Sequence, residues 1–167
     1  GVGHFYGHAS RGAEVANEVL QRLRFDNETR KAVVTLIRFH DTPIEPTEKA
    51  VRRRLNKLGP DGFFDLMALI RGDNAAQAPQ FQDRRETYDA VEALARKILE
   101  ENQCFSLKDL AVNGHDLMAL GLRGPALGAA LSTLLNAVVD GVCPNERDAL
   151  LAFLPGDANP SDDPQNK

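Results

Sequence analysis

Apolar residues recur every three or four positions along most of the chain, which is the spacing of one face of an α-helix. The pattern is clear over residues 10–23, and it resumes after Asn27, which we expect to cap a second helix. The apolar stripe of that helix starts at Val33 and reaches His40 at helical spacing, so this histidine should point toward the core.

Proline and glycine divide the rest of the chain. The segment "DTPIEPT" should end the second helix, Thr47 should cap a third, and Gly59-Pro60 should end it. A fourth helix follows, and the longest should run from Pro79 to about residue 102. Shorter helices are expected after it: one capped by Ser106, one in "NGHDLMALG", one in "GPALGAALSTLLNAVVDG", and one that Asn145 caps and that runs through Leu154.

No stretch alternates with period two long enough to predict a strand, so we expect an all-α protein. Residues 1–75 should form one helical bundle and residues 76–155 a smaller helical subdomain, with a hinge near "GDNAAQAP" or inside the long helix. Residues 156–167 are polar and rich in Asp and Pro, and we expect them to be a disordered tail.

Composition is that of an ordinary soluble protein, with 43% hydrophobic and 26% charged residues. No apolar run approaches the roughly 20 residues that a membrane span needs, and no segment has the pattern of a signal peptide. Cys104 and Cys143 have no CxxC spacing and are expected to be reduced thiols. We therefore expect a cytoplasmic protein that does not bind membranes.

The net charge of −4 hides a gradient along the chain. Residues 1–75 carry 12 Lys and Arg against 10 Asp and Glu, whereas residues 76–167 carry 8 against 14. The first half is therefore at +2 and the second at −6. An anionic partner should meet the first half, or local basic sites, rather than the whole surface.

Three basic sites are candidates for phosphate binding. The segment "VRRRLNK" brings together Arg52, Arg53, Arg54 and Lys57, and the planar donors of Arg suit phosphate. The alternative is an ordinary solvated helix face.

In "GLRGPALG", Arg123 and Gly124 precede a helix whose first N–H groups could bind phosphate. The alternative is a plain helix start with proline at its first position. Arg84 and Arg85, near the start of the longest helix, form a weaker third site.

Three side chains could form part of a metal site. His8 should begin the first helix, His40 should end the second, and Asp73 follows the fourth. Antiparallel packing of neighbouring helices could bring these ends together. Two imidazoles and a carboxylate suit a divalent metal such as Zn, Mn or Fe, although such a site also needs a fourth ligand. The alternative is structural, with His40 in the core and His8 at a helix start.

Two long segments carry a resemblance to a known family. "GHFYGHASRGAEVANEVLQRLRFDNETRKAVVTLIRFHD" resembles the later part of the HD domain in one branch of bacterial CCA-adding tRNA nucleotidyltransferases, which are related to poly(A) polymerases. "RGDNAAQAP" resembles the segment that carries the last HD-type aspartate. "FSLKDLAVNGHDLMALGLRGPALGAALSTLLNAVVDGVCPNERDALLAF" is similar to that family's C-terminal helical domain. The resemblance covers about residues 3–154.

The resemblance implies an incomplete set of catalytic groups. His8, His40 and Asp73 match the later HD ligands, whereas the early His and the His-Asp doublet have no counterpart in the chain. The adjacent His40 and Asp41 are not expected to be that doublet. The nucleotidyltransferase head, which binds Mg²⁺ and nucleotide triphosphates, lies N-terminal to this region in the family. The chain contains no Gly-Ser…Asp-x-Asp pattern. We therefore expect a truncated HD-like bundle followed by an RNA-binding subdomain, without catalysis by this chain alone.

The family's C-terminal helices imply a function in tRNA binding. They hold the acceptor and TΨC arms through phosphate contacts, measuring shape rather than sequence, which suits duplex RNA. Two alternatives stay open at this point: a metal-dependent HD-type phosphohydrolase, and a scaffold or dimerisation module. The sequence does not specify the oligomeric state.

Overall fold

The computed structural model describes residues 7–77 and 84–154, and its regular structure there consists of seven α-helices and one 3-10 turn. No strand occurs in these ranges, so the predicted all-α class is confirmed. The chain divides into two compact units, residues 1–96 and residues 97–167. The tail expected over residues 156–167 lies outside the described ranges.

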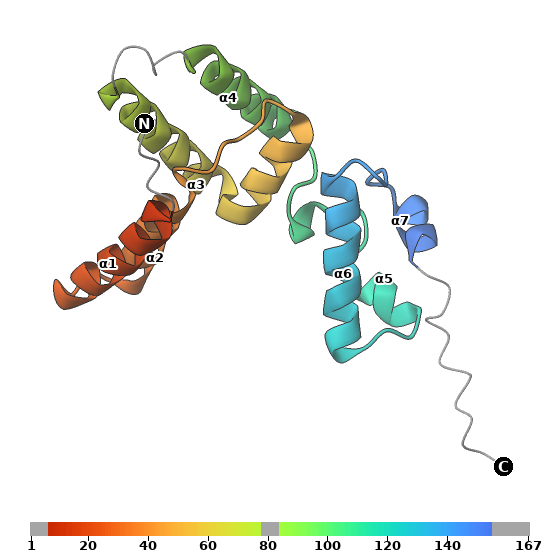
Figure 1. Cartoon of the computed structure of the whole chain (residues 1–167). Helices are drawn as coiled ribbons and strands as arrows, with labels where there is room; N and C mark the ends of the chain where they lie inside the picture. Colours follow the sequence, from red (N-terminus) through yellow and green to blue (C-terminus); the bar gives the residue numbers. More distant parts are fainter. Residues whose placement is uncertain (1–6, 78–83, 155–167) are drawn as a thin grey trace. The chain divides into compact units, whose positions relative to one another are not determined.

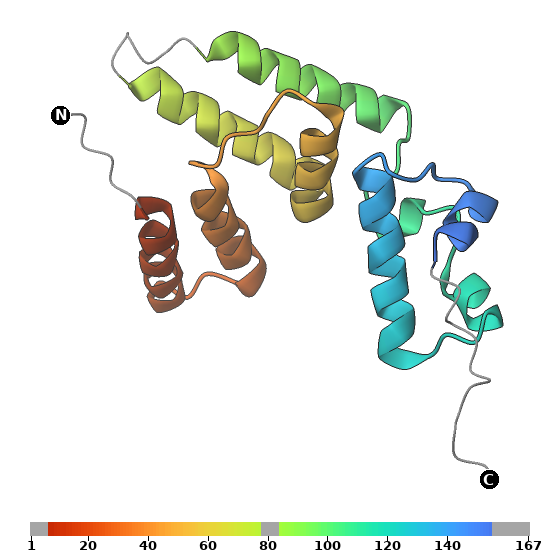
Figure 2. The ribbon, with the colours of Figure 1, turned by 45° about the vertical axis from the view of Figure 1, so that its right-hand side comes forward.

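Helices α1 (His8–Arg22) and α2 (Asn27–Phe39) form an antiparallel hairpin (Figures 1 and 2). Helix α2 begins because the Asp26 carboxylate accepts a 2.8 Å hydrogen bond from the Thr29 backbone N–H. The predicted cap at Asn27 is therefore wrong by one residue. The bonds from Thr29 hold the pKa of Asp26 below its usual value. Ala13 is the one fully buried α1 residue, and α2 has none, so most side chains of the hairpin keep some exposure to solvent.

Helix α3 (Glu48–Ala76) starts at Thr47, whose hydroxyl accepts a bond from the Ala50 N–H, as predicted. Gly59 interrupts the helix with φ 71° and ψ 171°, and Pro60 opens its second part. The third and fourth helices predicted from the sequence are thus the two parts of α3. Its buried side chains supply much of the first unit's core: Val51, Leu55, Phe63, Leu66, Met67 and Ile70.

Helix α4 (Arg85–Glu100) lies along the second part of α3 (Figures 1 and 2). Arg71 of α3 joins the two helices: its Nε donates to Glu92 at 2.7 Å and its Nη2 to Asp89 at 2.6 Å. These carboxylates raise the pKa of Arg71. The guanidinium also lies 5.8 Å from the centre of the Tyr88 ring. Because α4 is held to α3 in this way, the expected domain boundary between residues 75 and 76 falls inside the first compact unit.

The second unit contains η2 (Leu107–Asp109), α5 (Gly114–Ala119), α6 (Gly124–Val139) and α7 (Arg147–Phe153). Its core is built largely from the C-terminal half of α6, with Val112, Leu117 and Leu150 packed against it. Cys104 and Cys143 are buried free thiols. None of the described helices is long and apolar enough to cross a bilayer.

Candidate functional site

Three cations line one side of the first part of α3. Lys49, Arg53 and Lys57 are spaced four residues apart, and all three are exposed. Residues four apart are neighbours on a helix surface, so these side chains form a row that we call the α3 basic strip. Val51 and Leu55, on the opposite side, are fully buried. Arg53 and Lys57 were predicted from the sequence, whereas Lys49 was not, although the four-residue spacing could have revealed it.

The other two arginines of "VRRRLNK" are engaged with the fold. Arg52 lies 3.9 Å from Glu48, and its side chain is only 17% exposed. The Arg54 guanidinium carbon lies 4.9 Å from the centre of the Phe39 ring. Its Nη1 is buried without a hydrogen-bond partner among the described residues, and burial lowers the pKa of this arginine. Arg54 thus packs against α2 rather than facing the side of the strip.

A groove of about 350 Å³ lies between α2 and α3 and includes Lys57 of the strip. Lys31 of α2 lines it together with Lys57, over an apolar floor that includes Leu36. Asp61 and Asp65 line the same groove and limit its positive character. Lys31 was also missed from the sequence, because only the packing of α2 against α3 places it beside Lys57.

The two predicted metal-binding histidines are adjacent. Their rings meet edge to face with centres 5.3 Å apart, as expected from the antiparallel packing of α1 and α2. The Nδ1 of His40 donates to the Ile37 carbonyl at 2.6 Å, and the Nδ1 of His8 lies 3.9 Å from the Asp41 carboxylate. Asp73 accepts a 3.0 Å bond from the Gln77 amide.

This arrangement does not fit a metal ion. Among the residues that the structure describes, no three His, Cys, Asp or Glu side chains gather closely enough to hold one. A zinc-type site needs at least three protein ligands around one point.

The predicted site at the start of α6 also has a structural role. Arg123 is the N-cap residue, and its Nη1 donates to the Met118 carbonyl at 3.1 Å, close to the end of α5. Gly124 is exposed and has φ +52°, which favours glycine. Arg84 and Arg85 are both exposed at the start of α4. Arg84 lines a cavity of the first unit, together with His40 and Asp73.

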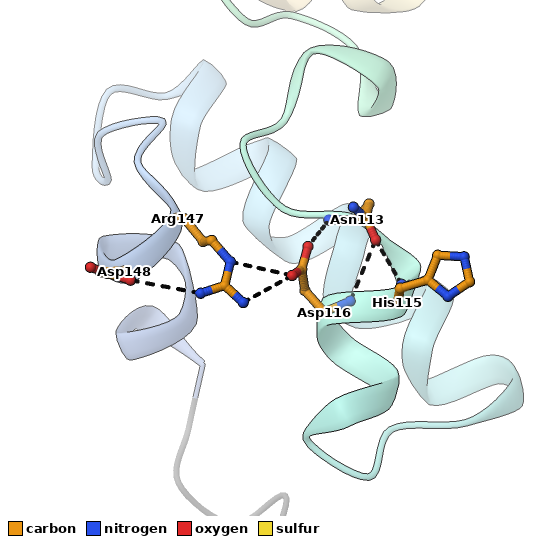
Figure 3. Close-up of polar contacts among 5 residues, drawn as sticks. All are labelled: Asn113, His115, Asp116, Arg147 and Asp148. Carbon is orange, nitrogen blue, oxygen red and sulfur yellow. Dashed lines mark hydrogen bonds and ion pairs between the residues drawn. The ribbon is translucent and has the colours of Figure 1, made fainter.

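The segment "NGHD", which lies in the region that resembles the family's C-terminal domain, is joined to the start of α7 by a network of hydrogen bonds (Figure 3). Asn113 caps α5 by accepting bonds from the backbone N–H groups of His115 and Asp116. The Asp116 carboxylate accepts one bond from the Asn113 N–H and two from Arg147. The His115 ring points away from this network and is exposed.

Asn145 forms a second hydrogen-bonded contact between distant segments of this unit. Its Oδ1 accepts from the Ala111 N–H and its Nδ2 donates to the Asp109 carbonyl, both at 2.8 Å. Asn145 therefore connects the segment before α7 to the last residue of η2 and to the segment that follows η2. The prediction that Asn145 caps the last helix is wrong, because the N-cap position belongs to Glu146. A bond to residues more than 30 positions away has no local sequence pattern.

Comparison with known proteins identifies relatives along nearly the whole chain. The family model described as tRNA nucleotidyltransferase domain 2 matches residues 6–154. The CC-adding tRNA nucleotidyltransferase of Thermus thermophilus is 33% identical over 152 residues, which are 90% of this chain and 33% of that protein. The A-adding tRNA nucleotidyltransferase of Deinococcus radiodurans is 26% identical over 80% of this chain and 31% of its own length.

A shorter match has a higher sequence identity. The CCA-adding enzyme of Levilactobacillus brevis is 54% identical over 48 residues, which are 28% of this chain and 12% of that enzyme. No solved structure gives a significant match. The chain spans about a third of the length of the Thermus and Deinococcus relatives. The family match covers most of the chain and agrees with its resemblance to the C-terminal region of these enzymes: the chain belongs to the tRNA nucleotidyltransferase domain 2 family.

Proposed function

We propose that this chain binds tRNA and positions it for a nucleotidyltransferase centre that lies outside these 167 residues. The observation that carries the proposal is the α3 basic strip of Lys49, Arg53 and Lys57, an exposed row of cations in a family whose relatives are named for tRNA. In the full-length enzyme, Mg²⁺ and nucleotide triphosphates would bind to the catalytic region, and this chain would contribute no catalytic group. Because the ligand is tRNA, the chain would act in the cytoplasm.

The geometry of the strip suits a regular phosphate backbone. Four residues of α-helix advance by about 6 Å, so the three side chains form an evenly spaced row. Long, flexible cationic side chains on a rigid helix can contact phosphates without reading bases. Duplex RNA is recognised mainly by its shape and through its phosphates and 2′-hydroxyls. A row of this kind would recognise the paired arms of tRNA largely independently of their sequence.

The parts of tRNA that we assign to this surface are the acceptor and TΨC arms, the paired region next to the 3′ end. Within the first unit, Arg84 and Arg85 provide further exposed donors, and the second unit has exposed donors of its own in Arg123 and Gly124. Lys31 would extend the contact from α3 onto α2. Arg52 and Arg54 are given no direct part in it, because their side chains are held against the fold.

The experiment is a titration of fluorescently labelled tRNA with the chain, followed by anisotropy at low salt. Arg53→Ala and Lys57→Ala should each weaken binding by about fivefold, which corresponds to about 1 kcal/mol for an exposed ionic contact. Arg11→Ala is the matched control, because Arg11 is an exposed arginine of α1 that pairs with Glu14. Equal affinities for all four proteins would contradict the assignment of the strip.

The metal-dependent phosphohydrolase is not proposed, since the described side chains do not fit a metal. The Thermus, Deinococcus and Levilactobacillus relatives are named for adding CC, A and CCA respectively.

A further inference from the structure

The first unit contains a cavity of about 340 Å³, and Arg84 is the one described lining residue of it that the tRNA-binding proposal uses. Its walls come from the segment that follows α2, from the second part of α3, and from the first turns of α4. Met67, Ile70 and Val91 form its apolar floor, and each is at most 9% exposed. The volume is within the range of roughly 300–1,000 Å³ that small-molecule sites occupy.

The side chains above this floor favour a flat ring. Tyr88 of α4 and His40 at the end of α2 both line the cavity and provide aromatic surfaces. Tyr88 is held in place by Arg71, whose guanidinium lies over its ring. Aromatic side chains of this kind stack on nucleobases, and such stacking tolerates different bases because every base has a π-face. An apolar floor beside aromatic walls thus suits a planar heterocycle.

The polar groups of the cavity favour one class of base over another. Asp41 and Asp73 both line it, and both are exposed, so their carboxylates can accept hydrogen bonds from a ligand. Carboxylates select bases that carry an amino group, as in the pairing of Asp or Glu with the N4 amino group of cytosine. They also disfavour phosphate inside the cavity. Arg84, the one arginine among the lining residues that the structure describes, is exposed and could hold a phosphate at the rim.

We propose that this cavity binds a single nucleotide whose base carries an exocyclic amino group, with the base on the apolar floor and the phosphate near Arg84. The nucleotide could be free or an unpaired residue of an RNA, and the recognition chemistry is the same in both cases. The proposal requires no metal and does not depend on the α3 basic strip. It gives His40 and Asp73 a role in shaping a base-binding site in place of the predicted metal site.

The test uses CMP and UMP, which differ mainly in an amino group against a carbonyl oxygen at one position of the base. Titration of the 167-residue chain, followed by calorimetry or by chemical-shift changes, should show CMP binding about tenfold more tightly than UMP. Thr87 lines the cavity and is exposed, so Thr87→Trp should fill it without disturbing the core, and CMP binding should be lost. Ala90→Trp is the control, since Ala90 is exposed one turn later and is not a lining residue.

Equal binding of CMP and UMP, no CMP binding at millimolar concentration, or unchanged binding by Thr87→Trp would each overturn the proposal. A single-stranded pentanucleotide with one central cytidine distinguishes the two sources of the ligand. Tighter binding of the pentanucleotide than of CMP identifies an RNA residue, and tighter binding of CMP identifies a free nucleotide. Arg53→Ala should leave CMP binding unchanged, so the failure of this proposal and the failure of the tRNA-binding proposal can be told apart.

Discussion

Arg147 at the start of α7 donates to the Asp116 carboxylate of α5 through both Nε, at 3.3 Å, and Nη2, at 3.0 Å (Figure 3). The same carboxylate accepts a bond from the Asn113 N–H and completes the capping box of α5. One side chain therefore both starts a helix and ties it to another. The segments "NGHD" and "NER", which lie about 30 residues apart, meet in one structural contact.

The pKa of Asp116 makes this contact testable by pH. The Asn113 N–H bond and, after it, Arg147 lower the pKa below the usual value of 3.8. A lowered folded-state pKa means that the stabilisation is complete above the unfolded-state value and disappears as the pH falls through the folded-state value. Asp116→Asn should therefore be less stable than wild type at pH 7, and the gap should close below about pH 4 in urea titrations.

Asp148→Asn is the control for that experiment, because Asp148 is 99% exposed and lies 4.0 Å from Arg147. It should follow the wild-type curve. A gap between wild type and Asp116→Asn that stays constant with pH would show that the carboxylate charge is not what stabilises α5.

Removing the Asn145 side chain should destabilise the second unit. Asn145→Ala leaves the Ala111 N–H and the Asp109 carbonyl without their 2.8 Å partners. Two lost hydrogen bonds of this kind correspond to a decrease of about 1–3 kcal/mol in the free energy of unfolding. Asn136→Ala, at an exposed position of α6, should change the urea midpoint little. Equal urea midpoints for the two variants would show that the Asn145 hydrogen bonds do not stabilise the second unit.

The kink in α3 predicts opposite effects for two glycines of the same helix. Gly59 has φ 71° and ψ 171°, a conformation that is costly for any residue with a side chain, so Gly59→Ala should lose about 1–3 kcal/mol. Gly72 lies in regular helix with open space around it, so Gly72→Ala should gain about 0.5–1 kcal/mol. Thermal unfolding of both variants measures this contrast, and a gain in stability for Gly59→Ala would be inconsistent with the kink.

A substitution of Arg54 distinguishes a role in packing from a role in phosphate binding. Arg54→Met keeps an apolar chain over Phe39 and removes the buried Nη1 that has no partner among the described residues. Because an unsatisfied buried donor costs about 1–3 kcal/mol, the variant should be at least as stable as wild type. Its tRNA affinity should match that of wild type in the anisotropy assay. A loss comparable to that of Arg53→Ala would mean that Arg54 also contacts RNA.

Much of the fold could be predicted from the sequence because it depends on local patterns. The helical spacing of apolar residues, the cap at Thr47 and the break at Gly59 are properties of short segments, and all three are confirmed. The caps at Asn27 and Asn145 were predicted wrongly for different reasons. Asp26, beside Asn27, is an equally good cap, and Asn145 is committed to partners that are distant in sequence.

The candidate site could be predicted only in part, since composition does not show which side of a helix faces solvent. Arg53 and Arg54 are adjacent in "VRRRLNK", yet one is exposed and the other lies over an aromatic ring of α2. Likewise, the antiparallel helices bring His8 and His40 together as expected. The hydrogen bond from His40 to the Ile37 carbonyl, however, is seen only in the structure. The cavity beside His40 has no sequence pattern, because its lining residues come from three segments.

The salt dependence of tRNA binding tests the central claim most directly. Each phosphate that the chain neutralises adds about 0.7–0.9 to the slope of log K against log salt. The wild-type chain should show a steep slope, and a triple variant with alanine at Lys49, Arg53 and Lys57 should lose about two units or more of it. A wild-type slope near zero, or identical slopes for the two proteins, would contradict the assignment of the α3 basic strip as the tRNA-binding surface.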